Sequence, residues 1–338
     1  MSKYAVEYVE DTVEVLDDYK SRKNNIFLIE KIYDKKTNRR KITISSHSDF
    51  CYKNELDPIE KFLYYRFVDD RIDVDVCSYN MKLYETMCEN IFKNTSYSLE
   101  KQSVNLELKI SGKINNMGFA NNNEYFVRGE TVVNAMSSLQ QLYMILKDEK
   151  ICKKGEENLE KYLDFVKCLK NYKELFELMK EHILLCYSFG NFYPIIYRYS
   201  KVKRGEFSLN RQKALYSLEG NGCKFDDVMS SWLKEMKKYI EEAQCENQKT
   251  TDLLNNNYNF WFAKYRKSTA ENTGWKQFIT DFKLKAFCEE NNEPRQFWKE
   301  PKEDATKEER LNLFKDYITN INAALVERNE DLIEFLNS

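Results

Sequence analysis

Glycine and proline are scarce in this chain. Among its 338 residues only 9 are glycine and 4 are proline. Long loop-rich or all-β folds need more of these turn-forming residues, so their scarcity favours helices. Aromatic residues, in contrast, make up 14% of the chain. Because such side chains supply large buried areas, we expect a packed globular core and no extensive disorder.

Histidine is almost absent, which limits the catalytic chemistry that the chain can perform. The two histidines are His47, which follows a predicted strand, and His182, which lies inside an apolar helical segment. The sequence contains no Gly-x-Ser-x-Gly motif, phosphate-cradling glycine loop or metalloprotease motif. No single reaction is therefore indicated, and function has to be inferred from less specific features.

Long apolar runs and paired cysteine motifs are missing as well. No stretch approaches the roughly eighteen apolar residues of a membrane span, and the first residues carry no apolar signal segment. The nine cysteines are scattered and include no Cys-x-x-Cys pair. This pattern is typical of reduced thiols, so we expect a cytoplasmic protein that does not enter a membrane.

The overall charge is close to neutral. The chain has 53 basic and 55 acidic residues, for a net charge of -2. This balance excludes a polybasic nucleic-acid coat and an acidic mimic of DNA, so any electrostatic function has to lie in a local patch. The richness in Lys, Asn, Glu, Ile and Tyr is typical of an AT-rich bacterial genome.

The hydrophobic pattern changes near residue 130. Before it, Val104, Leu106, Leu108 and Ile110 alternate with polar residues, which indicates a half-buried strand. Further strands are predicted at residues 26–33, 41–46 and 125–127. After it, the apolar spacing is helical. The expected helices cover residues 131–146, capped by Thr131, and then 156–170, 172–188, 224–245, 249–267, 275–290 and 307–336.

Strands that precede helices, without alternating with them, favour an α+β fold. We predict a predominantly α-helical protein in which a small N-terminal antiparallel sheet packs on a larger helical body. The mixed region would cover residues 1–130 and the helical body residues 131–338, and the two could also form one continuous domain. The proline-containing segment 291–306 is the best candidate for a linker.

Two stretches, residues 131–146 and 183–197, contain no charged residue although 32% of the chain is charged. We expect both to be core helices. The first also carries neutral polar residues at helical spacing, namely Asn134, Ser137, Ser138 and Gln141. An unpaired polar group out of water costs about 1–3 kcal/mol, so this stripe should face either an internal polar network or a ligand.

One place near these stretches could bind an anion. Arg128 and Glu130 directly precede the predicted helix start, where the helix dipole attracts negative charge, although Glu130 would oppose a phosphate. In the second stretch Gly190 is expected to end a helix and Pro194 to prevent its continuation.

The segment 198–213, which we call the basic segment, is strongly cationic. It has six basic residues and one acidic residue, for a net charge of +5. Tyr199 and Phe207 are interleaved with the cations, and basic residues with aromatics can hold phosphates and stack on bases. The alternative is a solvated loop that shields neighbouring acidic surface.

A carboxylate pair offers a different possibility. If residues 72–76 form a strand, Asp73 and Asp75 share one of its faces and could hold Mg²⁺. Glu130 would then supply acid–base chemistry, with Arg128 and Arg211 as clamps. A solvated acidic edge is the preferred interpretation of Asp73 and Asp75.

Several short motifs resemble a family of uncharacterised bacterial proteins. The first is Arg128-Gly129-Glu130-Thr131 with Asn134, and the second is Gly190-Asn191-Phe192 followed by Pro194. Further similar elements are Asn210-Arg211, the helix from Asp226, Trp275 with Phe278-Ile279, and Arg328-Asn329. The resemblance covers roughly residues 100–335. It implies a shared fold and brings no mechanism.

Two hypotheses follow. In the first, the chain is a binding protein without a resident cofactor that engages nucleic acid, a nucleotide or a protein through the surface of residues 190–213. Its candidate binding residues are Arg128, Glu130, Asn134, Asn191, Arg198, Lys203, Arg204, Asn210 and Arg211. In the second, it is a carboxylate- and Mg²⁺-dependent enzyme that acts on a phosphorylated or nucleic-acid substrate. A role in phage defence is compatible with both.

Overall fold

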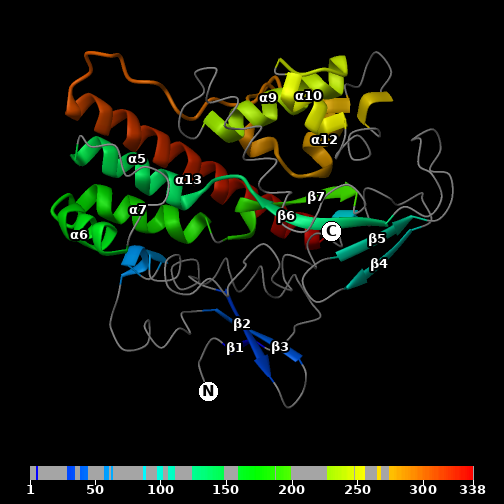
Figure 1. Ribbon diagram of the computed structural model, residues 1–338, viewed down its shortest axis with the longest axis horizontal. Helices are drawn as coiled ribbons and strands as arrows, with labels where there is room; N and C mark the ends of the chain where they lie inside the picture. Colours follow the sequence, from blue (N-terminus) through cyan, green and yellow to red (C-terminus); the bar gives the residue numbers. More distant parts are fainter. Residues whose placement is uncertain are drawn as a thin grey trace. The chain divides into compact units, whose positions relative to one another are not determined.

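The computed structural model describes part of the chain, and helices account for most of that part (Figure 1). The described residues are 5–6, 29–34, 39–44, 57–60, 62–63, 87–88, 97–101, 106–110, 124–147, 159–186, 188–198, 227–246, 248–255, 265–267 and 274–337. The predicted predominance of helices is confirmed. Within these residues, no helix combines the length and the apolar character that crossing a membrane requires.

Most of the helices lie close to the ranges predicted from the periodicity. One exception is the helix predicted for residues 249–267: an α-helix covers only Gln248–Leu253, Tyr265–Lys267 form a 3-10 turn, and residues 256–264 lie outside the described ones. The helices are α5 (Ala135–Lys147), α6 (Leu159–Leu169), α7 (Lys173–Cys186), α9 (Asp227–Glu242), α10 (Gln248–Leu253), α12 (Gly274–Asp281) and α13 (Lys307–Asn337). Three short 3-10 turns are η2 (Phe189–Asn191), η5 (Tyr265–Lys267) and η6 (Lys285–Phe287). The helix predicted for residues 275–290 is too long, because the chain leaves α12 through Lys283, whose φ of 52° is incompatible with a continuing helix.

The chain forms two compact units, each built from segments that are discontinuous in sequence. Unit 1 consists of Met1–Tyr79, Val133–Asn191 and Phe297–Ser338, and unit 2 of Asn80–Val132 and Phe192–Gln296. The sequence suggested one division near residue 130, whereas the chain passes between these units four times. The division into a 1–130 region and a 131–338 body stays a prediction.

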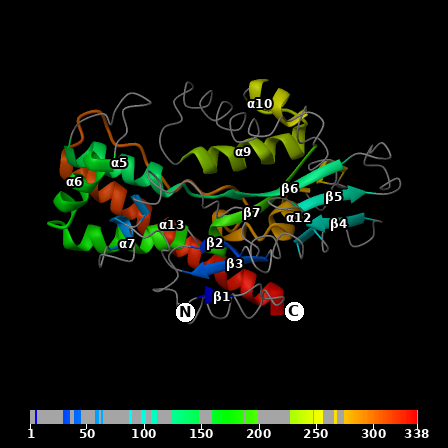
Figure 2. The ribbon, with the colours of Figure 1, turned by 60° about the horizontal axis from the view of Figure 1, so that its bottom comes forward.

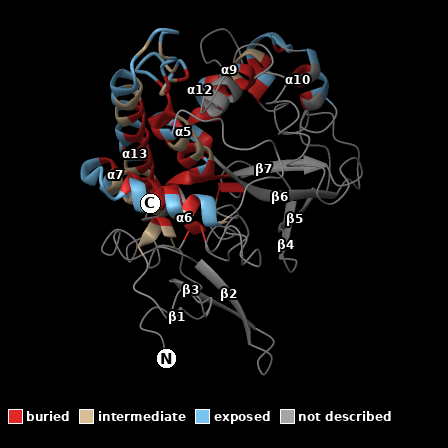
Figure 3. Ribbon diagram, turned by 60° about the vertical axis from the view of Figure 1, so that its left-hand side comes forward, coloured by how far each residue is buried: buried red, intermediate tan, exposed pale blue. Residues whose placement is uncertain are grey.

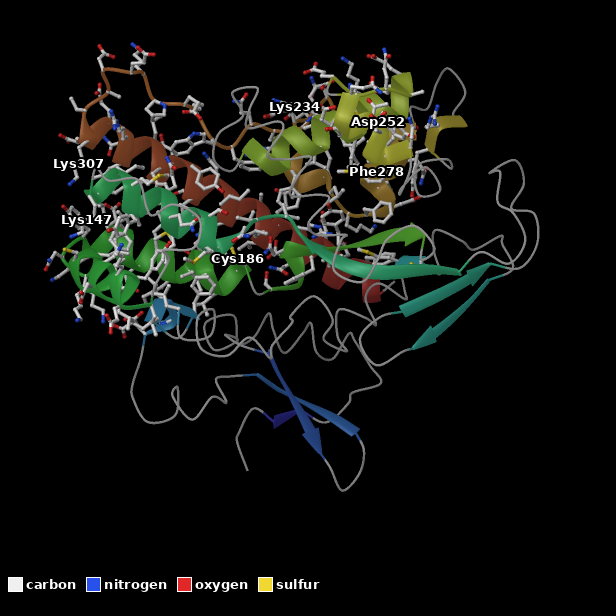
Figure 4. The ribbon with its side chains drawn as sticks, in the orientation of Figure 1. Lys147, Cys186, Lys234, Asp252, Phe278 and Lys307 are labelled. Atoms are coloured by element: carbon white, nitrogen blue, oxygen red, sulfur yellow. The ribbon has the colours of Figure 1, made fainter. Side chains whose placement is uncertain are left out.

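Unit 1 contains helices α5, α6, α7 and α13, which lie side by side in Figures 1 and 2. Each helix turns an apolar stripe inward, and Figure 3 shows buried positions on one side of α13 with exposed positions on the other. Leu139, Ile183 and Leu325 are fully buried in this core. The long helix α13 contacts α5, α7 and η2, so it joins the other parts of the unit.

Helix α5 begins later than the sequence suggested. Asn134 is its N-cap, because its Oδ1 accepts hydrogen bonds from the backbone N–H groups of Met136 (2.9 Å) and Ser137 (3.3 Å). The prediction that Thr131 caps this helix is wrong. Thr131 is the last residue of strand β6 (Glu124–Thr131) and pairs with Phe192 of strand β7 (Phe192–Arg198).

The second uncharged stretch does not form one core helix. Helix α7 ends at Cys186, four residues before the predicted stop at Gly190, and Gly190 lies in η2. Pro194 then lies within strand β7, opposite Gly129. The local sequence is uncharged throughout, and the partner strand β6, some 60 residues earlier, decides that this part is extended.

Unit 2 contains an antiparallel sheet in the order β4-β5-β6-β7. Strand β4 spans Tyr97–Lys101 and β5 spans Leu106–Ile110, and β5 pairs with β6 so that Leu106 lies opposite Val127. The same unit has an aromatic cluster around α12. There the rings of Tyr265 and Phe282 surround Phe278 at centroid distances of 5.1 and 4.8 Å.

Three more strands lie in the N-terminal part of the chain. They are β1 (Ala5–Val6), β2 (Ile29–Asp34) and β3 (Arg39–Ile44), in the order β1-β3-β2. Strands β2 and β3 pair antiparallel, with Ile29 opposite Ile44. The predicted packing of a small sheet on the helical body goes beyond these pairings and is considered under the proposed function.

Candidate functional site

Unit 1 holds a line of buried polar side chains where α5, α7, η2 and α13 meet. We call these residues the polar seam. They are Ser138, His182, Ser188, Asn191, Asn322, Arg328 and Asn329. In a core that is otherwise apolar, such groups have to be hydrogen-bonded to be tolerated. The seam is therefore the first place in the described residues to look for either chemistry or structural linkage.

His182 joins three helices. Its Nδ1 lies 2.8 Å from Asn322 Oδ1 on α13, and its Nε2 lies 2.9 Å from Ser138 Oγ on α5. A neutral imidazole with its proton on Nδ1 donates to Asn322 and accepts from the Ser138 hydroxyl. Complete burial lowers the pKa of His182 from 6.5 to about 4, and the Asn322 hydrogen bond opposes this shift. The imidazole is therefore neutral at pH 7.

The arrangement of Ser138, His182 and Asn322 has the order of a nucleophile, a base and an orienting group. Two features argue that it is structural instead. Ser138 and His182 are both 0% exposed, so a substrate would have no path to the hydroxyl. In addition, a base with a pKa of about 4 has little driving force to take a proton from a serine at neutral pH.

Asn191 holds the start of α5 against the end of α7. Its Oδ1 accepts a hydrogen bond from the backbone N–H of Val133 at 2.7 Å, and its Nδ2 donates to the carbonyl oxygen of Val133 at 2.9 Å. The same Nδ2 donates to the carbonyl oxygen of Cys186 at 2.7 Å. This side chain gives Val133 the donor and acceptor that a neighbouring strand would supply. Its amide is used entirely within the protein.

A second group of contacts ties η2 to α13. The backbone N–H of Gly190 donates to Asn329 Oδ1 at 2.6 Å, and Asn329 Nδ2 donates to Ser188 Oγ at 2.9 Å. From the same helix, Arg328 Nη1 donates to the carbonyl oxygen of Gly190 at 2.7 Å. Both backbone groups of Gly190 are thus bound by consecutive residues of α13.

The approach of α13 to η2 requires glycine at position 190. A Cβ atom placed there would lie 2.5 Å from the carbonyl oxygen of Leu325 and 2.9 Å from Asn329 Cγ. The first of these atoms belongs to the backbone and cannot move without displacing the helix. Gly190 is needed here for close packing between two backbone segments.

Unit 2 has its own buried polar cluster, in the turn after α9. Glu235 Oε2 accepts a hydrogen bond from the backbone N–H of Glu246 at 3.0 Å, and Thr251 Oγ1 accepts one from the backbone N–H of Cys245 at 2.9 Å. Burial raises the pKa of Glu235 and raises that of Cys245 to about 12. These groups satisfy the backbone of the turn, and the Cys245 thiol stays protonated.

The residues proposed from the sequence fall in different places. Asn134 is the exposed cap of α5 and Asn191 belongs to the polar seam, both in unit 1. Three others are in the sheet of unit 2, since Arg128 pairs with Ile195, Glu130 with Tyr193, and Arg198 with Tyr125. Because Arg128 and Glu130 are strand residues, they do not stand at the start of α5. The remaining candidates lie outside the described residues, namely Lys203, Arg204, Asn210, Arg211, Asp73 and Asp75.

Of the seven seam residues, the sequence indicated Ser138 and Asn191 directly, and the family resemblance added Arg328 and Asn329. Ser138 was indicated by its place in an uncharged polar stripe, and its partner is the internal network, not a ligand. The sequence did not indicate that His182 is the hydrogen-bond partner of Ser138, or that Asn322 is the partner of His182. A usable signal was present, because Asn322 and Asn329 are seven residues apart on α13 and therefore on one face of that helix.

Comparisons of the chain with protein-family models, curated proteins and solved structures gave no match. The resemblance to an uncharacterised bacterial family therefore stays a prediction. Two of its motifs, Gly190-Asn191 and Arg328-Asn329, nevertheless meet in the polar seam. Across the part of the chain that the structure describes, no group of three or more His, Cys, Asp and Glu side chains is arranged to hold a metal ion.

Proposed function

We propose that the protein binds nucleic acid through the basic segment, residues 198–213. One observation carries the proposal, which is the net charge of +5 within sixteen residues that begin at the end of strand β7. Arg198 is the last residue of that strand and pairs with Tyr125 in the sheet. The first cation of the segment therefore starts from a regular element of unit 2.

The charge of the rest of the chain supports this proposal. The whole chain has a net charge of -2 and the basic segment +5, so the remaining residues carry -7. A phosphate polymer is repelled by that net acidic remainder and attracted to this short cationic stretch. Tyr199 and Phe207 add rings on which bases can stack. A nucleic acid uses both features, whereas a solvated loop needs neither.

The polar seam supports this proposal indirectly, because its polar groups are used within the protein. The amide of Asn191 and both backbone groups of Gly190 are used in contacts within unit 1. These residues fix η2, and η2 leads directly along the chain into β7 and then into the basic segment. We infer that the seam is scaffold and that the ligand is contacted further along the chain.

Charge-neutralising variants test the proposal. A triple variant, Lys203→Gln with Arg204→Gln and Arg211→Gln, is compared with wild type for binding a fluorescent single-stranded oligonucleotide by anisotropy. Each phosphate contact contributes strongly at low salt, so three lost contacts should weaken binding by about 100-fold at 100 mM salt.

A matched control removes the same charge elsewhere. Lys234, Lys299 and Lys302 are exposed, so their replacement by Gln leaves the core intact. This control should bind within about twofold of wild type if the basic segment is the site. Equal binding by both triple variants would refute it. If the protein binds a nucleotide or another protein but not the oligonucleotide, the proposal that its ligand is nucleic acid is wrong.

The remaining expectations from the sequence are part of this proposal. We place the activity in a bacterial cytoplasm, where reduced thiols are normal. The structure gives Cys88, Cys168, Cys186, Cys245 and Cys288 as thiols, in support of this location. We also propose that the N-terminal strands pack as a small sheet on the helical body, which gives an α+β fold.

A further inference from the structure

The imidazole of His182 is buried, and within the described residues no counter-charge contacts it. Its contacts come from all three helices around it, namely Ser138 on α5, Asn322 on α13 and Cys186 Sγ (3.6 Å) on its own helix α7. Among the described residues none of these contacts is a carboxylate. The only charged residue of α5 is Lys147, which is exposed at its end, and the buried charge on α13 is the cation of Arg328.

Among the side chains that the structure describes around it, a proton on His182 would meet hydrogen-bond acceptors but no negative charge. The Ser138 hydroxyl lies 3.5 Å from the carbonyl oxygen of Asn134, so it can turn toward that oxygen and accept from a protonated Nε2. Asn322 Oδ1 already accepts from Nδ1. These two hydrogen bonds do not offset the free energy of desolvating an imidazolium cation in a close-packed apolar core.

We propose that Ser138, His182 and Asn322 form an acid-sensitive latch that holds α5, α7 and α13 together while the imidazole is neutral and releases them when it binds a proton. The geometry supports this because each of the three helices contributes one member and all three side chains are buried. We use α13 to follow this release, since it contacts both α5 and α7.

The direction of the pH effect follows from proton linkage. The pKa of His182 is 6.5 in the unfolded chain and about 4 in the folded one, so below pH 6.5 the open form binds more protons. The stabilising contribution is complete above pH 6.5 and is lost as the pH falls toward 4. Between pH 6.5 and 4 the equilibrium constant for opening should rise roughly 80-fold through this one group.

Hydrogen exchange between pH 7 and 4.5, corrected for intrinsic rates, measures the opening of each helix. Amides of α5, α7 and α13 should lose protection as the pH falls, while those of α9 and α12 in unit 2 keep theirs. In a His182→Gln variant, which cannot take up the proton, the protection of α13 should be independent of pH over this range. A His182→Gln variant with the wild-type pH response would overturn the proposal.

A direct titration covers the case in which His182→Gln does not fold. The chain has two histidines, so a His47→Gln variant leaves a single imidazole whose NMR signals need no assignment. In the folded protein that imidazole should stay neutral down to pH 5, and its protonation should coincide with the loss of α13 protection. Protonation near pH 6.5 with the helices still protected would contradict the latch.

Discussion

Gly190 and Asn329 lie so close together that no side chain fits between them. The backbone N–H of Gly190 donates to Asn329 Oδ1 at 2.6 Å, and a Cβ atom at position 190 would lie 2.9 Å from both Asn329 Cγ and Nδ2. These residues are 139 positions apart in sequence. Their contact joins the turn before β7 to the C-terminal helix.

Gly190→Ala should therefore destabilise unit 1. The added methyl group has to displace either Asn329 or the backbone of α13 at Leu325, and overpacking of this kind costs about 3 kcal/mol. Urea unfolding monitored by circular dichroism measures the loss. Asn320→Ala, at an exposed position of the same helix, is the control and should change stability by less than about 0.5 kcal/mol. Equal stabilities for the two variants would show that α13 does not pack against Gly190.

Asn191 makes a sharper test, because its amide both donates and accepts. Asn191→Ala leaves the backbone groups of Val133 and Cys186 unpaired, at a cost of about 3 kcal/mol. Asn191→Asp keeps the acceptor for Val133 N–H but places a carboxylate oxygen against two carbonyl oxygens. It should be at least as damaging as alanine in the same unfolding experiment. A nearly wild-type Asn191→Asp variant would mean that the Nδ2 contacts are unimportant.

Gly274→Ala tests unit 2 in the same way. A Cβ atom at position 274 would overlap the carbonyl oxygen of Tyr265, so η5 and the start of α12 would have to separate. We expect a loss of more than about 3 kcal/mol and faster proteolysis near residues 265–282. Thr280→Ala, at an exposed position of α12, should leave the proteolysis pattern unchanged. A Gly274→Ala variant with wild-type stability and proteolysis would contradict the close approach of Gly274 to Tyr265.

The cysteines should differ widely in reactivity. Burial raises the pKa values of Cys245 and Cys288 to about 12, so little thiolate exists at pH 8. Cys168 is exposed. Iodoacetamide at pH 8, followed by peptide mass mapping, should label Cys168 at least about 100-fold faster than the other two. Rapid labelling of Cys245 in the folded protein would show that the turn after α9 opens readily.

The helices could be predicted because their apolar residues recur at helical spacing, as in α13. The boundary near residue 131 could not. Val132 and Val133 fit the helical pattern, yet β6 continues to Thr131 because its partner is β7, which lies some 60 residues further along the chain. The helix starts at Asn134, whose side chain satisfies its first free N–H groups. Sequence periodicity carries no information about a distant strand.

The hydrogen-bond partners in the polar seam could not be predicted from local sequence either. A neutral polar residue in an uncharged stretch indicates that a partner exists, and Ser138 does have one. Which residue it is depends on tertiary packing, since His182 lies 44 positions from Ser138 and 140 from Asn322. Local sequence could therefore indicate that Ser138 and Asn191 are unusual, but not that both serve to hold helices together.

The most direct test of the binding account is the salt dependence of affinity for a single-stranded oligonucleotide. If the basic segment neutralises five phosphates, the logarithm of the association constant should fall with the logarithm of salt concentration at a slope of about -4 between 50 and 300 mM NaCl. A flat dependence, or no measurable binding at 50 mM, would contradict the account.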